Sequence, residues 1–498
     1  MSTPVLPTDR PAKSAGPREW AALVPLTLAV TLLAVDGTVL ALAVPSLTAD
    51  LNASGTELLW IGDIYSFALA GLLITMGTVA DRIGRRRLLI IGGVGFGLVS
   101  LLAAFAPGPG WLIAARALLG VAGATLMPST LSIVRNLFPD DRQRTRAVAI
   151  WSTGAAGGAA LGPVVGGFLL EHFWWGSVFV INLPVMTLMV ATVLWLVPES
   201  RDPRPGSFDL LSALLSVLAI VPLVWAVKHL AHEGADGFGL GAALAGVAFG
   251  WIFVQRQRRL SHPLVDVTLF RRPAFSGTVL AQFIAIFAFS GLLYFFSQYL
   301  QLVKGYSPLQ AGLRELPLTI ASIAVVVVAV PLIVRLGVGR SLGFSLFFTA
   351  LGLAVLAVFE TVEGYAGLAL GLVIIGLGVG VVFAAATDAV LSSVPSERAG
   401  SASAISEMSY ELGVAVGIAV LGSLQGVLYR NHLPEGAGAA VQDSLARAAQ
   451  VLPDGELLEA ARHSFAEAMQ ATSWIAAGLV VVAGLVAWRV IPSGTTSR

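Results

Sequence analysis

The sequence predicts an all-α integral membrane protein with 14 transmembrane helices, and three observations point to that fold. Of the 498 residues, 56% are hydrophobic and 12% are charged, whereas roughly 25% are charged in an average soluble domain. Apolar runs of about twenty residues, long enough to cross a ~30 Å hydrocarbon layer, recur along nearly the whole chain. Arginines and lysines gather in alternate loops, as they do in membrane proteins of fixed orientation.

Hydropathy windows place the expected helices in order along the chain. The first span is too long for a signal-peptide core and lacks a small-residue cleavage site, so we expect it to remain as a helix. A polar tail at 1–19 precedes it, and a second tail at 493–498 follows the last span. The expected spans are 21–44, 58–79, 88–106, 111–134, 147–170, 176–197, 209–229, 238–255, 274–303, 309–334, 341–359, 365–391, 400–429 and 470–491.

Lysine and arginine placement predicts the orientation of these helices. When the loops are assigned alternately to two sides, 23 of the 30 lysines and arginines fall on the side of both termini. Six fall on the other side, and Arg116 lies within an expected helix. Positively charged loops stay in the cytoplasm, so we expect both termini there and the chain in the bacterial inner membrane. The residues counted on the outer side are Lys228, Lys304, Arg314, Arg430, Arg447 and Arg462.

A faint internal repeat indicates two related halves. The segment DRIGRRRLL after the second expected helix resembles VRLGVGRSL after the tenth. We therefore expect an N-terminal six-helix bundle at 20–200, two inserted helices at 201–260 and a C-terminal six-helix bundle at 261–492. The matching positions are Arg82 and Arg335, Gly84 and Gly337, and Arg87 and Arg340.

One segment on the expected outer side, 431–467, is long for a loop. Apolar residues recur at helical spacing in 441–448 and again in 457–465, and the breaker Pro453-Asp454-Gly455 separates the two stretches. We expect an extracellular helical hairpin packed on the outer face. A mobile loop is the alternative.

Composition also argues against other classes of protein. The sequence holds no cysteine, so disulfides and thiolate metal sites are excluded. The six histidines lack metal-ligand spacing, and a net charge of +1 without a basic cluster gives no reason to expect a nucleic-acid partner. No GxxxxGK[ST] loop is present, which argues against an ATP-driven pump. We expect no metal, no cofactor and no enzyme activity.

Charged side chains at membrane depth are costly, and they are therefore the first candidates for a functional site. Asp36 lies about fifteen residues into the first expected span, too deep to reach the headgroups. Arg116, in the fourth span, has no neighbouring acid on its own helix, so Asp36 is its expected partner. A proton arriving on Asp36 would release Arg116, which makes the pair a candidate coupling site. The alternatives are a structural ion bridge, or an aspartate held by backbone groups near Gly37.

Two glutamates in the thirteenth span form a second candidate site. Glu407 and Glu411 are four residues apart, so both lie on one helix face, where like charges repel and one is expected to hold a proton. Such a pair can exchange a proton for a cation. The alternative for Glu407 is a solvated residue near the cytoplasmic end of the helix.

Asp63 is expected near the outer mouth, close to Trp60 and Tyr65, where it can attract cations; a solvated or helix-capping aspartate is the alternative. Aromatic side chains can stack against flat or quaternary cations, each contributing about 0.5–2 kcal/mol. The candidates are Tyr294, Phe295, Phe296, Tyr299 and Tyr410.

Two glycine-containing segments are candidates for conformational gating. In the loop after the second span, small residues permit close helix contact and an acid can pair with an arginine. In the fifth span, glycines and a proline on one face predict tight packing and a kink. A plain positive loop and a packing seam are the respective alternatives. The residues are Gly77, Asp81, Arg82, Gly84 and Arg85 in the loop, and Gly158, Gly162, Pro163, Gly166 and Gly167 in the helix.

These segments resemble the signature motifs of the major facilitator superfamily. The resemblance includes the loop motif just described, with Arg86, and an antiporter motif in the fifth span. It extends from about Trp20 to Trp488 and is closest to the 14-helix drug:proton antiporters. The other matching residues are Arg116, Gly120 and Gly123 of the fourth span, and Asp36, Thr38 and Pro45 of the first.

The resemblance implies a proton-coupled multidrug antiporter of the kind that confers antibiotic resistance. It implies that small cationic molecules such as quaternary ammonium compounds, dyes and fluoroquinolone-like drugs are exported by alternating access, in exchange for protons. Acids of the first and thirteenth spans carry protons or contact drugs in that family, which matches Asp36, Glu407 and Glu411. Some relatives have an acid within the tenth span, whereas this chain has only Glu315 near its outer end. We expect a monomer surrounded by lipid; the alternatives are an exporter of one endogenous metabolite, antibiotic or lipid, and a transport-inactive sensor.

Overall fold

The computed structural model describes residues 15–201, 209–261, 263–392 and 399–491, and within these ranges the chain is helical without strands. Fourteen helical stretches are long and apolar enough to span a membrane, as predicted. The helices are α1 (Pro17–Leu51), α2 (Gly55–Ile83), α3 (Arg85–Ala104), α4 (Pro109–Leu137), α5 (Asp141–His172), α6 (Ser177–Val180), α7 (Asn182–Leu196), α8 (Leu210–Glu233), α9 (Gly237–Arg259), η1 (Leu269–Arg271), α10 (Pro273–Gln298), η2 (Tyr299–Val303), α11 (Pro308–Ala324), α12 (Val326–Leu336), α13 (Val338–Phe359), α14 (Ala366–Ser392), α15 (Ala399–His432), α16 (Ala439–Asp443), α17 (Leu445–Val451) and α18 (Glu456–Val490).

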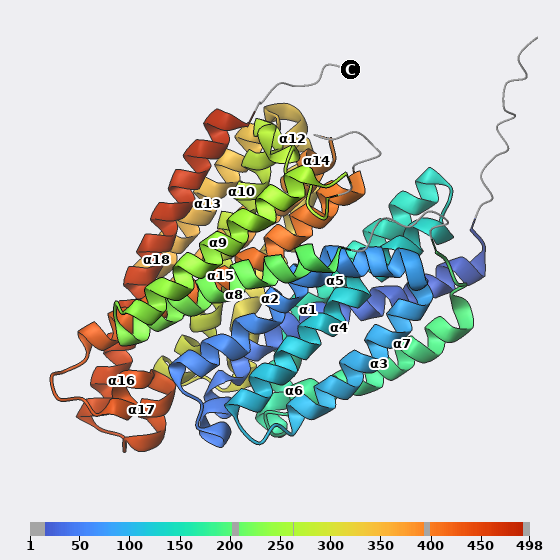
Figure 1. Ribbon diagram of the computed structural model, residues 1–498. Helices are drawn as coiled ribbons and strands as arrows, with labels where there is room; N and C mark the ends of the chain where they lie inside the picture. Colours follow the sequence, from blue (N-terminus) through green and yellow to red (C-terminus); the bar gives the residue numbers. More distant parts are fainter. Residues whose placement is uncertain (1–14, 202–208, 262, 393–398, 492–498) are drawn as a thin grey trace, which may run out of the picture.

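The two ends of the helical array differ. Figure 1 shows the short helices α16 and α17 at one end, which we name the hairpin end, while α18 finishes at the opposite end. Because the number of spans is even, α1 begins where α18 finishes, and we name that side the termini end. The predicted cytoplasmic side corresponds to the termini end.

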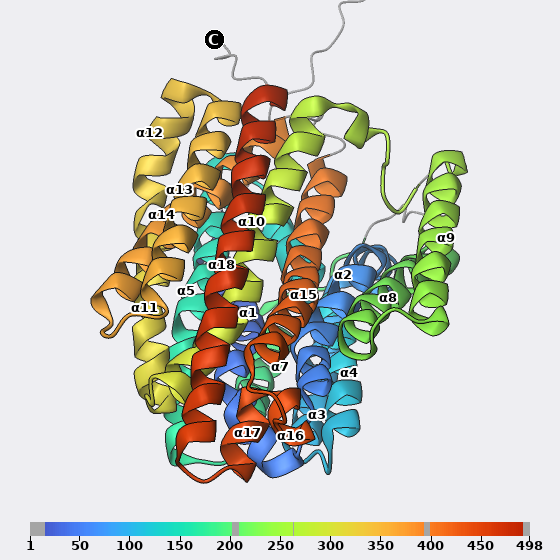
Figure 2. The same cartoon turned by 90° about the vertical axis from the view of Figure 1, so that its left-hand side faces the viewer.

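Two groups of helices and a separate pair make up the array. Helices α1–α7 and α10–α15 with α18 form the two larger groups, and α8 and α9 lie to one side, with α8 beside α2 and α15 (Figure 2). The turn between α2 and α3 and the turn between α12 and α13 both depend on a glycine with positive φ, Gly84 at 114° and Gly337 at 79°. These are matching positions of the sequence repeat, and L-residues other than glycine rarely adopt this conformation.

Some element boundaries differ from the expected ones. The sixth and ninth spans agree with the expected bounds to within one residue, the sixth being α6 with α7 and the ninth being α10 extended by a five-residue π-helix, η2. The segment 457–465, expected to form the second arm of a separate hairpin, is instead the first part of α18, which runs unbroken from Glu456 to Val490. Leu458, Ala461 and Phe465 are buried, whereas Leu457 is exposed, and the helix continues the last span beyond the expected start at 470.

Glycines allow α5 to pack against α1 at very short range. A Cβ atom built at Gly158 would lie 2.3 Å from the carbonyl oxygen of Thr31, and one at Gly162 would lie 1.9 Å from Oγ1 of Thr38. Real Cβ atoms do not approach other atoms this closely, so no larger residue fits without movement of α1. The glycine face of α5, for which the sequence predicted tight packing, therefore makes a close contact with α1.

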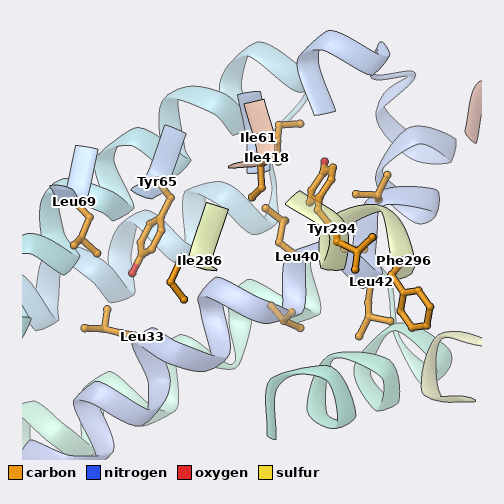
Figure 3. Close-up of a cluster of buried hydrophobic side chains, with 14 of the residues drawn as sticks. Leu33, Leu40, Leu42, Ile61, Tyr65, Leu69, Ile286, Tyr294, Phe296 and Ile418 are labelled. Atoms are coloured by element: carbon orange, nitrogen blue, oxygen red, sulfur yellow. The ribbon is translucent and has the colours of Figure 1, made fainter. Parts of the chain in front are cut away.

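The two larger groups of helices touch each other near the hairpin end. At the α5–α11 contact, a Cβ at Gly312 would lie 2.1 Å from the carbonyl oxygen of Pro163, and one at Gly167 would lie 2.6 Å from that of Pro308. At the α2–α15 contact, Tyr294 of α10 lies near Ile61 and Ile418 within the buried apolar cluster of Figure 3. These contacts join the outer halves of the two groups.

Candidate functional site

A buried ion pair links α1 and α4. Nη1 of Arg116 lies 2.6 Å from Oδ2 of Asp36, and both side chains are almost completely buried. Nε of Arg116 also donates a hydrogen bond to the carbonyl oxygen of Ile61, at 3.2 Å. The pairing expected from the sequence is thus present.

Asn182 completes the surroundings of this pair. Its side-chain amide donates to Oδ1 of Asp36 at 3.0 Å and to Oγ of Ser100 at 3.1 Å. Each carboxylate oxygen of Asp36 therefore has its own donor, which fixes the orientation of the carboxyl group. Sequence reasoning missed Asn182; the signal available was an amide residue inside an otherwise apolar span.

Tyr65 and Glu411 extend the site from the N-terminal group to the C-terminal group. The guanidinium carbon of Arg116 lies 4.6 Å from the centre of the Tyr65 ring. Glu411 of α15 is close enough to Ser66 of α2 for their side chains to interact, and close enough to Arg116 for a direct charge interaction. Charged groups of both halves of the protein therefore meet at one place.

Glu411 and Glu407 lie on the same face of α15, and both are half-buried. Among the described residues, no lysine, arginine or histidine is within ion-pair distance of either glutamate. Tyr410 lies between them in sequence, is also half-buried, and has its ring centre 5.4 Å from that of Phe383. The two glutamates are thus available to bind a proton or an external cation.

Asp63 does not lie at a solvated mouth, as one reading of the sequence had it. It is fully buried in α2, and its Oδ2 lies 2.6 Å from Nζ of Lys228 in α8. Lys228, counted above with the outer loops, lies within a helix that continues to Glu233 and is itself 2% exposed. The apolar window gave no sign of this partner, because a lysine near the end of a span also fits a loop.

Most of the aromatic candidates lie away from Glu411, near the hairpin end. The hydroxyl of Tyr294 donates to the carbonyl oxygen of Leu58 at 2.7 Å, and that of Tyr299 to the carbonyl oxygen of Glu360 at 2.5 Å. Both rings are buried, and Phe296 is completely so. Phe295 instead lines a pocket at the hairpin end. Of the five aromatic candidates named from the sequence, Tyr410 is the one that lies beside the glutamates.

The loop motif connects α2, α3 and the end of α7. Asp81 accepts hydrogen bonds from Nε and Nη2 of Arg85, at 3.0 and 2.8 Å. Glu199 accepts hydrogen bonds from the backbone N–H groups of Arg86 and Arg87, both at 3.2 Å, at the start of α3. A carboxylate is favourable at a helix N-terminus, and Glu199 was not identified from the sequence.

The glycine Gly84 is required at this corner for two reasons. Its φ of 114° suits glycine, and a Cβ atom there would lie 2.5 Å from Oε1 of Glu199. Gly77 lies nearer the middle of the α2–α4 contact, where a Cβ atom would meet Pro128 at an ordinary 3.7 Å. Arg82 is on the last turn of α2. A Cβ atom at Gly166 of α5, by contrast, would lie only 2.0 Å from Cγ2 of Val39.

The described residues contain no group of three or more histidine, aspartate or glutamate side chains arranged to hold a metal ion. The candidate site itself is made of carboxyl groups, one guanidinium, an amide, hydroxyls and aromatic rings. Such groups can bind protons and organic cations.

Comparisons with known proteins identify the relatives of this chain. The family profile described as Major Facilitator Superfamily matches residues 26–418. The multidrug efflux pump LfrA of Mycolicibacterium smegmatis is 44% identical over 482 residues, which cover 94% of this chain and 95% of LfrA. The methyl viologen resistance protein SmvA of Salmonella typhimurium is 37% identical over 465 residues, covering 90% of this chain and 93% of SmvA.

A solved structure has a similar fold. It is a bacterial homologue of the human lysosomal transporter Spinster in an inward-facing and occupied conformation. It superposes with a TM-score of 0.67 over 95% of this chain and 97% of its own, at 18% sequence identity. At this identity the similarity concerns the fold alone.

Proposed function

Since this chain belongs to the Major Facilitator Superfamily, we propose that it is a proton-coupled antiporter that exports lipophilic cationic compounds by alternating access. That it is a multi-pass efflux transporter of this family, and not an enzyme, follows from its relatives and its 14 spans. The substrate class and the coupling ion are the proposed parts.

The position of Glu411 is the observation that carries this proposal. Glu411 belongs to the C-terminal group of helices, yet its side chain lies close enough to interact with Ser66 and Arg116 of the N-terminal group. A carboxyl group in this position can change charge and thereby change the attraction between the two groups. Alternating access requires such a link between ligand binding and the relative position of the two halves.

The exchange itself is competition for carboxylates. When Glu407 and Glu411 are protonated, nothing attracts a cation to them. When they are ionised, the cationic group near Glu411 is Arg116, which is already paired with Asp36, so the two carboxylates can attract a positive guest. Asp36 differs, because Arg116 already neutralises it. A proton on Asp36 would weaken its hold on Arg116 and leave the guanidinium free to turn toward Glu411.

Aromatic groups would add affinity without narrow selectivity. Tyr410 lies between the two glutamates in sequence and can stack on a flat or quaternary cation, for about 0.5–2 kcal/mol. The names of two relatives, a multidrug efflux pump and a methyl viologen resistance protein, agree with cationic substrates of varied shape.

The same proposal assigns the direction of transport. With the termini end in the cytoplasm of a bacterium, the outer halves of the two groups are in contact in this structure, through α5 and α11 and through α2 and α15. Substrate would enter from the cytoplasm, and protons from outside would later displace it. Exchange of one proton for one monovalent cation moves no net charge, so the pH gradient alone would drive it.

The decisive experiment is ethidium efflux from proteoliposomes that contain the purified protein, with an imposed pH gradient. We expect efflux by the wild type that stops when the gradient is collapsed, and none by Glu411→Gln. Gradient-driven efflux by Glu411→Gln at the wild-type rate would contradict the proposal. Transport of a single compound out of a panel of unrelated cations would favour the alternative, a dedicated exporter.

A further inference from the structure

The inserted helix α8 places an ammonium group in the interior. Nζ of Lys228 lies 2.6 Å from Oδ2 of Asp63 and 3.7 Å from the centre of the Trp60 ring. A carboxylate beside the face of an indole is the arrangement that proteins use to bind ammonium ligands. The chain thus contains an ammonium-binding site, and its own lysine occupies it.

The Asp63–Lys228 ion pair has unmet hydrogen-bonding capacity, so it contributes little to stability. Oδ1 of Asp63 has no hydrogen-bond partner within the described ranges, and Nζ of Lys228 meets the carboxylate without good hydrogen-bond geometry. Both groups are at most 2% exposed. A buried pair with unmet hydrogen-bonding capacity contributes little net stability, because desolvation of both charges opposes their attraction. Asp36, with a donor on each oxygen, is a clear contrast.

A pocket adjoins this pair at the hairpin end. It holds about 640 Å³ of space free of atoms, part of it open to solvent. Lys228, Tyr294, Phe295 and Phe465 are among its lining residues, but Asp63 and Trp60 are not. The lysine side chain therefore stands between the pocket and the carboxylate.

This inference rests on the proposed export of lipophilic cations. We propose that Asp63 and Trp60 form a second cation site for substrates, and that Lys228 occupies it as a tethered competitor. A substrate with one positive charge uses Glu407 and Glu411 and leaves Lys228 in place. A substrate with a second positive charge can place that charge at Asp63 only by displacing Lys228. Lys228 is then the residue that limits affinity for dications.

Ethidium and propidium make a matched pair of probes, because propidium is the same chromophore with one additional quaternary ammonium arm. Binding to the purified full-length protein is measured by fluorescence for the wild type, Lys228→Met, Lys228→Arg and the double variant Asp63→Asn with Lys228→Met. We expect Lys228→Met to bind propidium at least about tenfold more tightly than the wild type, as a newly available buried charge partner implies. Its affinity for ethidium should stay within about twofold of the wild type.

The other two variants locate the effect. Lys228→Arg keeps a cation tethered beside Asp63, so its propidium affinity should equal that of the wild type. The double variant lacks the Asp63 carboxylate, so it should lose the increase in propidium affinity seen for Lys228→Met. Three results would overturn the inference. They are equal changes in affinity for both dyes, a gain in propidium affinity that persists in the double variant, and unchanged propidium affinity in folded Lys228→Met. Absence of ethidium binding by the wild type would instead overturn the proposed function, and this inference with it.

A second measurement needs no substitution. Lys228 is one of three lysines in the sequence, and Lys304 lies at the hairpin end as an internal reference. Amine acylation is followed by mass spectrometry on the wild-type protein. We expect saturating propidium to raise the acylation of Lys228 several-fold relative to Lys304, and ethidium to leave the ratio unchanged. An unchanged ratio with propidium would contradict displacement of the lysine.

Discussion

Asn182 donates a hydrogen bond of 3.0 Å to Asp36, although 146 positions separate the two residues in sequence. Because Arg116 binds the other carboxylate oxygen, Asp36 is held on both sides. Glu411 interacts with Ser66 and Arg116 without an ion pair to a described residue, and it is half-buried. The protein therefore contains one fixed acid and one adaptable acid near Arg116, and the two should respond differently to substitution.

Arg116→Met should destabilise the protein strongly. Removing the guanidinium leaves the Asp36 charge buried without its partner, which costs about 3–5 kcal/mol in comparable buried pairs. The thermal unfolding midpoint of purified protein, followed by tryptophan fluorescence, would report the loss. The matched control is Asp36→Asn combined with Arg116→Met, which removes both charges and should recover most of the midpoint. A double variant no more stable than Arg116→Met would contradict this account.

Glu411→Gln should abolish the release of protons that accompanies cation binding. In the wild type, a bound cation replaces a proton on the glutamates, so ethidium added to weakly buffered protein should acidify the solution. A pH indicator measures the change. Glu407→Gln should reduce the release, and Glu435→Gln, an exposed position near the hairpin end, should leave it unchanged. Wild-type proton release by Glu411→Gln would remove this residue from the coupling site.

Gly162→Ala should disrupt the contact between α1 and α5. The added Cβ atom would lie 1.9 Å from Oγ1 of Thr38, so helix movement would cost about 1–3 kcal/mol. Gly157→Ala is the matched control on the same helix, since no atom lies within 4 Å of a Cβ there. The yield of monodisperse protein and the unfolding midpoint should fall for Gly162→Ala only. An equal fall for both substitutions would contradict the packing argument, since alanine is the better helix former at either position.

Glu360 should make stability depend on pH. It lies just beyond α13 and accepts a hydrogen bond from Oγ of Ser473 at 2.9 Å. Burial raises the pKa of the Glu360 carboxyl from its ordinary 4.5 to about 8, and the Ser473 hydrogen bond opposes this shift. Between these values the folded protein keeps a proton that the unfolded chain loses. The free energy of unfolding should therefore fall as pH rises from about 5 to about 8, by up to about 1.4 kcal/mol per unit.

Glu360→Gln should flatten this dependence, because glutamine carries no titratable proton. Unfolding midpoints measured from pH 5 to 9 would be compared with those of Glu363→Gln, whose side chain is exposed. The Glu363→Gln curve should follow that of the wild type. If Glu360→Gln kept the wild-type slope, the buried carboxyl would not be the source.

The number and order of the spans could be predicted because hydropathy and arginine placement act locally along the chain. The Asp36–Arg116 pair could be predicted as well, since two opposite charges at membrane depth have few other ways to be neutralised. The Asp63–Lys228 pair could not, because Lys228 lies close enough to a span end for a loop assignment to be equally sound. Asn182 and Glu199 act through hydrogen bonds to partners far along the chain, and composition carries no trace of those. The stretch 457–465 was assigned to a separate hairpin instead of the last span. The reason is that a helix that emerges from the membrane keeps its apolar face while its average hydropathy drops.

At Gly312 and Gly167, bare backbone of one half of the protein touches bare backbone of the other. Because no side chains lie between them, these two backbone surfaces cannot adapt by changing rotamers or by compression. The contact therefore acts as a pivot between the two halves. Rotation of the two halves about this contact would be transmitted rigidly along α5 and α11. A single methyl group on Gly312 would therefore push the outer halves of the two helix groups apart.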